Sequence, residues 1–183
     1  MIKTLYKKEL SYYLKNPIGY ITVVLFGIFS NFLFVKDLFA SGSASMKPFF
    51  AVVPWVMLIF IPALAMRSFA EEKRTNTIET LLSFPITETE ITLAKSGALL
   101  TVLGIALSLT LLIPVTLIYY SHLYLPEILA GYVGLLLYGL SVIGISVFFS
   151  SITKNQVIAF LYSVICIFLM LVVATEFTAN VLP

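Results

Sequence analysis

The chain alternates long apolar runs with short polar segments. The apolar runs that contain no Lys, Arg, Asp or Glu are residues 16–35, 48–66, 96–126, 128–153 and 155–175. Each run reaches the roughly 20 residues that a helix needs to cross about 30 Å of hydrocarbon. The runs are continuously apolar, whereas a membrane β-barrel needs short strands of alternating character. The pattern therefore predicts an all-α, polytopic bundle of five transmembrane helices, with residues 1–183 forming a single transmembrane domain.

Composition supports this prediction. The chain is 60% hydrophobic and 11% charged, with a mean hydropathy of +1.05. An ordinary soluble domain carries about 25% charged residues, so this chain cannot cover a globule of its size with polar surface. Cys166 is the only cysteine, so an intrachain disulfide is excluded.

Residues 1–15 are too polar to span a membrane, but their apolar positions recur at helical spacing. These positions are Ile2, Leu5, Tyr6, Leu10, Tyr13 and Leu14. The pattern predicts an amphipathic helix in the headgroup layer, in contact with membrane lipids. A solvated basic leader is the alternative interpretation. Pro17 suits the first turn of the first span and breaks this helix from it.

The lysines and arginines lie mostly in alternate segments. Four precede the first span, four lie in the segment 67–95 and one lies between the last two spans, against two after the first span. Positive charge is retained on the cytoplasmic side. The N-terminus and the segment 67–95 are therefore expected in the cytoplasm.

The segment 67–95 holds nine of the chain's twenty charged residues and is expected to be a cytoplasmic loop. Asn76 and Thr87 each precede an acid by three residues, as in a capping box, with Glu90 as the second acid. Pro85 ends the first of these two predicted helices. Ile86 and Ile91 bracket the second box at the positions of a hydrophobic staple.

The short helix between these signals is amphipathic, with Ile78, Leu81 and Leu82 on one face. Such a helix suits docking into a groove of another protein, or lying on the bilayer. The acidic residues Glu71, Glu72 and Glu79 disfavour anionic lipid as its sole partner. A soluble partner subunit is the preferred interpretation.

The spans carry no signature of catalysis. Their interiors contain no ionisable Lys, Arg, Asp or Glu, and functional groups of intramembrane enzymes and pumps are of this kind. We expect no enzymatic activity, no metal site and no nucleic-acid partner. Pro54, Pro62 and Pro114 would bend their helices, either as hinges or as static kinks.

The stretch EEKRTNTIETLLSFPITETEITLAK resembles the cytoplasmic loop of ABC-2 type permeases, the membrane subunits of ABC transporters. The matching residues are Glu71, Glu72, Lys73, Thr77, Ile78, Glu79, Leu81, Leu82, Pro85, Glu90, Ile91 and Lys95. The N-terminal KELSYYLKNPIGYI is similar to the opening of the gliding-motility and copper-site-maturation branch. Asn76 stands where the family usually has Gly, and Ala94 precedes Lys95 where Gly is usual. Asn tolerates a left-handed turn, so the loop geometry is expected to persist.

The resemblance implies a half-transporter of the bacterial inner membrane that pairs with a second permease subunit as a homodimer or heterodimer. The helix 78–84 would be a coupling helix that docks on a separate ABC ATPase. ATP and Mg would be bound by that partner, because the chain has no GxxxxGK[ST] motif. The family pattern also implies a sixth span, which would be missing after residue 183.

Two functions follow. The first is a permease subunit that couples ATP hydrolysis to export. The alternative is a non-transporting membrane scaffold of the same descent that anchors a cell-envelope complex. Nothing in the spans selects a substrate class.

Overall fold

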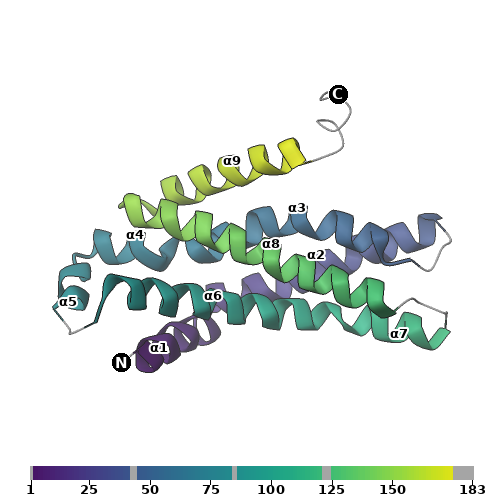
Figure 1. The fold of residues 1–183 in the computed structure, drawn as a ribbon, viewed down its shortest axis with the longest axis horizontal. Helices are drawn as coiled ribbons and strands as arrows, with labels where there is room; N and C mark the ends of the chain where they lie inside the picture. Colours follow the sequence, from purple (N-terminus) through teal and green to yellow (C-terminus); the bar gives the residue numbers. More distant parts are fainter. Residues whose placement is uncertain (1, 42–44, 84–85, 121–124, 175–183) are drawn as a thin grey trace.

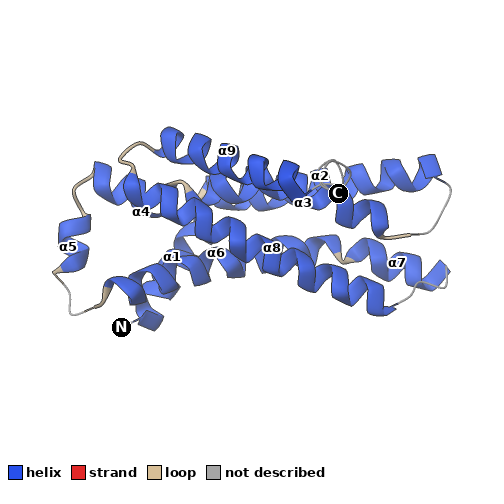
Figure 2. Cartoon of the chain, turned by 45° about the horizontal axis from the view of Figure 1, so that its top comes forward, coloured by secondary structure: helices blue, strands red, loops and turns tan. Residues whose placement is uncertain are grey.

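The computed structural model describes residues 2–41, 45–83, 86–120 and 125–174, and the regular structure in them is helical (Figure 1). The described helices are α1 (Ile2–Lys15), α2 (Pro17–Ser41), α3 (Lys47–Ala65), α4 (Arg67–Arg74), α5 (Ile78–Leu82), α6 (Glu88–Thr110), α7 (Leu112–Tyr120), α8 (Leu125–Ile152) and α9 (Gln156–Ala174). Figure 2 shows no strand among them. The all-α prediction is confirmed.

Within the described residues, five helical segments are long and apolar enough to cross a membrane. They are Gly19–Lys36 in α2, Lys47–Arg74 across α3 and α4, Glu88–Leu117 across α6 and α7, Leu125–Ile152 in α8 and Gln156–Ala174 in α9. The predicted polytopic bundle is therefore confirmed, although two of its segments are broken helices.

The core lies where α2, α3, α6 and α8 pack together, with α9 against α3 and α8. Phe49, Met57 and Val102 are almost completely buried in it. Gly139 allows a close approach of α8 to α6, because an added Cβ would lie 2.2 Å from a methyl carbon of Leu103. A larger residue there would force the Leu103 side chain to move.

Helix α1 packs against α6 and then turns into α2 at Asn16. Leu5 and Tyr13 are buried against the bundle, and the Tyr6 hydroxyl lies 2.7 Å from the Thr101 hydroxyl. The predicted apolar face exists, but much of it covers protein. The predicted break at Asn16 is confirmed, because α2 begins at Pro17.

The remaining apolar surface faces outward. Helix α9 has only Ala159, Ser163 and Ile167 buried, while residues such as Phe168 and Met170 are exposed. Exposed apolar side chains of this extent are expected of a helix surrounded by lipid or by another membrane protein.

Candidate functional site

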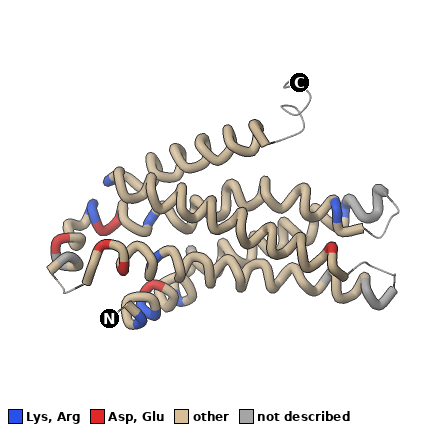
Figure 3. Tube along the Cα trace, viewed as in Figure 1, with Lys and Arg blue, Asp and Glu red and all other residues tan. Residues whose placement is uncertain are grey.

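Charged side chains gather at one end of the bundle, where α1, α4, α5 and the first turns of α6 meet (Figure 3). We call this region the charged end. It brings the N-terminal lysines together with the charged segment 67–95. The two polar parts of the sequence therefore form one structural region.

The first part of the charged segment is a helix. Helix α4 follows α3 after a break at Met66 alone, so the expected cytoplasmic loop 67–95 begins with a helix that the sequence analysis did not predict. Its place in the cytoplasm stays a prediction. Arg67 and Glu71 explain part of this continuity, because they form a bidentate pair one turn apart, at 2.8 and 3.0 Å. Such pairs stabilise a helix instead of ending it.

The joint between α3 and α4 is held by Ser150 of α8. Its Oγ donates to the Met66 carbonyl oxygen at 2.9 Å and accepts the N–H groups of Phe69 and Ala70, at 3.0 and 3.1 Å. Lys73 Nζ also donates to the Ser151 carbonyl oxygen. One face of α4 is therefore bonded to the end of α8.

Asn76 ends α4 and does not cap α5, so the predicted capping box at Asn76 is wrong. Its φ of 56° is left-handed, and the N–H of Thr77 donates to the Glu72 carbonyl oxygen at 3.0 Å. A left-handed residue with this bond forms the Schellman end of a helix. Thr77 is the residue before α5, and its side chain makes no capping bond.

Helix α5 lies at the far edge of the charged end (Figure 1). Leu81 packs against the cluster formed by Leu5 and Ile91, and Ile78 lines a groove beside it. Glu79 is exposed. The side chain of Leu82, and the whole of Pro85 in the predicted coupling segment, lie outside the described residues.

The second predicted helix start is confirmed. The Thr87 hydroxyl accepts the Glu90 N–H at 3.3 Å, and the Glu90 carboxylate accepts the Thr87 N–H at 3.1 Å. Ile91 is buried and Ile86 packs on the same cluster, as the staple positions predict.

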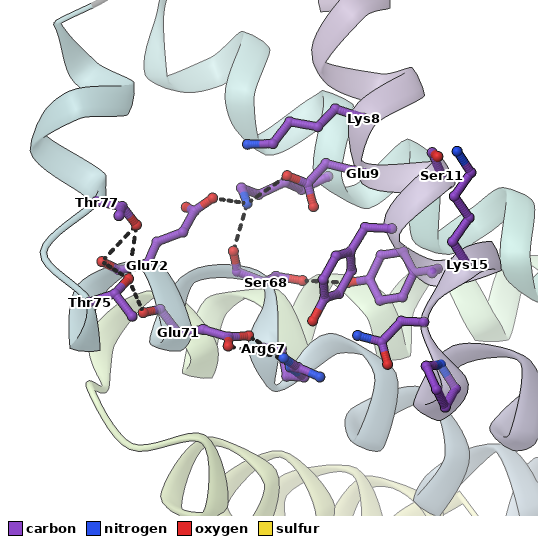
Figure 4. A pocket seen from close by; sticks show the side chains of 15 residues that line it. Lys8, Glu9, Ser11, Lys15, Arg67, Ser68, Glu71, Glu72, Thr75 and Thr77 are labelled. Atoms are coloured by element: carbon purple, nitrogen blue, oxygen red, sulfur yellow. Dashed lines mark hydrogen bonds and ion pairs between the residues drawn. The ribbon is translucent and has the colours of Figure 1, made fainter.

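Lys95 lies at the centre of the charged end with 2% of its side chain exposed. Its Nζ donates to Glu72 Oε1 at 2.8 Å, to the Ser68 carbonyl oxygen at 2.7 Å and to Glu9 Oε1 at 3.3 Å. Figure 4 shows these groups converging on one ammonium group. The ammonium also lies 5.1 Å from the centre of the Phe69 ring. We call Lys95, Glu9, Ser68 and Glu72 the Lys95 cluster.

Sequence reasoning missed Glu9, Ser68 and Ser150. A signal existed for Glu9, because it stands four residues from both Leu5 and Tyr13 and so shares their buried face. No comparable local signal marks the other two, since serine is common in membrane helices.

Tyr13 forms the second contact between α1 and α4. Its hydroxyl lies 3.4 Å from the Leu64 carbonyl oxygen, as donor, and 3.3 Å from the Ser68 hydroxyl. Burial raises the pKa of the Tyr13 phenol above its usual value, so the group stays neutral and able to donate. Arg67 lies 5.3 Å from the centre of the Tyr12 ring.

These groups border a hollow of about 740 Å³ between α1 and α4 (Figure 4). Its walls carry both signs of charge, and much of that charge is already used in ion pairs within the chain. Within the described ranges, no three His, Cys, Asp or Glu side chains are grouped so that they could hold a metal ion. The arrangement joins helices; it does not resemble a nucleophile with its base.

The proline positions differ in their effect. Helix α3 continues through Pro54 and Pro62. The third span breaks at Leu111, between α6 and α7, three residues before Pro114. Pro114 cannot donate to the Thr110 carbonyl group, and its ring crowds that group, which explains the break. Movement at any of these positions stays a prediction.

The fold and the charged end define a multi-pass membrane protein in which a short helix is held outside the spans. The family model described as "ABC-2 family transporter protein" matches residues 2–181. The chain therefore belongs to this family of transporter membrane subunits, which supports a permease-type role. Its members normally work with an ABC ATPase and are generally not catalytic themselves. Comparisons with curated proteins and with solved structures give no match.

Proposed function

We propose that this chain is the membrane-spanning subunit of an ABC exporter and that α5, with the turn before it, receives the movement of a separate ATPase. The family membership supports the first part. The sequence supports the second, because it lacks a GxxxxGK[ST] motif and so leaves ATP and Mg to the partner.

The observation that carries the proposal is the position of α5. This helix projects beyond the ends of the spans, and the helices before and after it in the chain, α4 and α6, belong to the bundle (Figure 1). Three exposed residues lie at the N-terminal end of α5: Asn76, Thr77 and Glu79. A soluble protein can reach this surface, and a force applied there is delivered to α4 and α6.

The candidate residues take different parts in this proposal. Thr77 and Glu79 form the exposed surface, together with the turn at Asn76. Ile78 and Leu81 hold α5 against the bundle, because their side chains line the groove or join the Leu5 cluster. The remaining acids, Glu71 and Glu72, act within the chain through Arg67 and Lys95.

The wider setting is also part of the proposal. The excess of Lys and Arg supports a cytoplasmic side for the charged end. The family resemblance supports the inner membrane of a bacterial cell as the place of the spans. Two permease subunits pair there, and α1 touches the headgroup layer through its exposed lysines. The resemblance of residues 8–21 supports the gliding-motility and copper-site-maturation branch. Nothing in the described residues favours the non-transporting scaffold.

The test is recovery of the ATPase with a charge-reversed chain. The wild-type chain, purified from the membranes of its own host, is expected to bring with it a protein that has a Walker A motif. Glu79→Lys should lose most of that protein and keep normal membrane insertion. Glu127→Lys is the control, because Glu79 and Glu127 both lie in the first turn of a helix and α8 begins at the end of the bundle opposite α5 (Figure 1). Recovery of the same amount of the Walker A protein with Glu79→Lys as with the wild-type chain would contradict the proposed contact.

A further inference from the structure

Lys95 satisfies its whole hydrogen-bonding capacity with groups from other helices. An ammonium group has three N–H donors. Its three acceptors come from α1, through Glu9, and from α4, through Glu72 and the Ser68 carbonyl group. Lys95 itself belongs to α6. One buried side chain therefore joins three helices that are far apart in the sequence.

The charges make this junction difficult to open. Two carboxylates face one ammonium group, and Glu72 Oε2 is buried with no hydrogen-bond partner. Breaking a buried ion pair leaves an uncompensated charge away from water, which is strongly unfavourable. Movements that keep α1, α4 and α6 together are therefore favoured over movements that separate them here.

The junction is also continuous with α5. The Glu72 side chain binds Lys95, while its backbone carbonyl oxygen accepts the N–H of Thr77, the residue before α5. A displacement of α5 can therefore act on Glu72, and through Lys95 on α6 and on Glu9 of α1. This polar route runs beside the apolar contact of Leu81 with Leu5 and Ile91.

We propose that Lys95 is a positioning residue that makes α1, α4 and the near end of α6 move as one body with α5. This inference rests on the proposed function, since it describes how movement received at α5 is passed on. Helix α1 leads into the first span, α4 continues the second and α6 begins the third. A push at α5 would therefore reach three spans together.

The decisive variant removes the junction without leaving a buried charge. Lys95→Met alone would leave Glu9 and Glu72 facing each other without a cation, which destabilises the fold whatever the role of Lys95. The triple variant Lys95→Met/Glu9→Gln/Glu72→Gln is neutral at all three positions and keeps similar side-chain sizes. Its control is Glu71→Gln, which breaks the Arg67–Glu71 ion pair within α4 and keeps the Arg67 side chain over the Tyr12 ring of α1.

The readout is the distance between spin labels at positions 7 in α1 and 74 in α4, both exposed, in a Cys166→Ser background. The distance distribution is measured by double electron–electron resonance, first on the full chain alone. It is then measured on the complex of the chain with the co-purified ATPase, with and without ATP. The parent and the Glu71→Gln control should give one narrow distance that ATP does not change. The triple variant should give a broadened distribution in the chain alone and an ATP-dependent shift in the complex, while still binding the ATPase.

A narrow, ATP-independent distance in the triple variant would overturn the inference and leave Lys95 a purely structural ion-pair partner. If the triple variant does not fold, Glu9→Gln decides, because it keeps a neutral Lys95–Glu72 pair and should broaden the distance through loss of the ionic contact to α1. If the parent chain binds no ATPase, the proposed function fails separately. The measurement on the chain alone then still decides whether Lys95 holds α1 to α4.

Discussion

At the scale of single residues, Asn76 shows how a correct residue type can be assigned the wrong role. Asn is common both before a helix and in the left-handed position after one. The capping-box pattern placed Asn76 at the start of α5, whereas the Thr77–Glu72 bond places it at the end of α4. The φ of 56° confirms the left-handed turn that was expected from the Gly usual at this position, and it is this conformation that separates the two roles.

Substitution of Asn76 should follow this backbone conformation. Asn76→Gly should keep the stability of the chain or raise it slightly, because Gly adopts positive φ without steric cost. Asn76→Val should cost about 1–2 kcal/mol, because a β-branched side chain is disfavoured in the left-handed region, which Asn tolerates. Limited trypsin cleavage after Lys73 and Arg74 in the purified chain measures the effect. Equal cleavage rates for the two variants would contradict the assignment.

Thr87 and Lys95 show which contacts can be predicted from neighbouring residues and which cannot. The Thr87 capping box was predictable because its partners are three residues apart. The burial of Lys95 was not, because its acceptors lie 86, 27 and 23 residues away on two other helices. Long-range partners of a charged residue can be found only once the helices are placed.

At the scale of elements, helix α4 was not predicted from the sequence. The segment is charged and still helical, because its ionic side chains have partners. Glu72 meets Lys95 on one face, and Lys73 meets the Ser151 carbonyl group on another. The spans, in contrast, were predicted well, since uninterrupted apolar length directly reflects the thickness of the bilayer.

The link between α4 and α8 can be tested through Ser150. Ser150→Ala leaves the buried N–H groups of Phe69 and Ala70 without their acceptor, which should cost about 1–3 kcal/mol and lower the thermal unfolding temperature. Ser146→Ala is the matched control, because Ser146 is equally buried on α8 but donates only within its own helix, to the Val142 carbonyl oxygen. Equal losses in the two variants would show that Ser150 has no special part in the joint.

Helix α5 combines a correct and a revised prediction. Its existence as a short amphipathic helix was predicted from the residues around Ile78 and Leu81. The use of its apolar face was not, because Leu81 packs on the protein's own Leu5 cluster. The proposed partner surface is therefore the exposed side near Glu79, and Leu81 becomes a residue that holds α5 in place.

At the scale of the whole molecule, the concentration of charge at one end gives the bundle a direction (Figure 3). Positive-inside retention predicts that this end faces the cytoplasm. In a Cys166→Ser background, a single cysteine at Lys47 should react with a membrane-impermeant maleimide added outside intact cells, and a cysteine at Glu79 should not. Both positions are exposed in the structure, so accessibility within the protein is matched. Labelling of Glu79→Cys alone would reverse the orientation.

The joined architecture also explains why one small helix can matter to the whole bundle. Helix α5 follows α4 in the chain. Helix α4 is bonded to α8 through the Ser150 joint, and to α1 and α6 through the Lys95 cluster. The spans need not carry functional charges of their own if movement enters from this end.

The most direct measurement of the central claim is photo-crosslinking from a benzophenone amino acid at position 79, in membranes of the native host. The account predicts an adduct with a protein that carries a Walker A motif, and no such adduct from position 47 at the opposite end. An adduct with that protein from position 47 but none from position 79 would contradict the assignment of α5 as the surface that meets the ATPase.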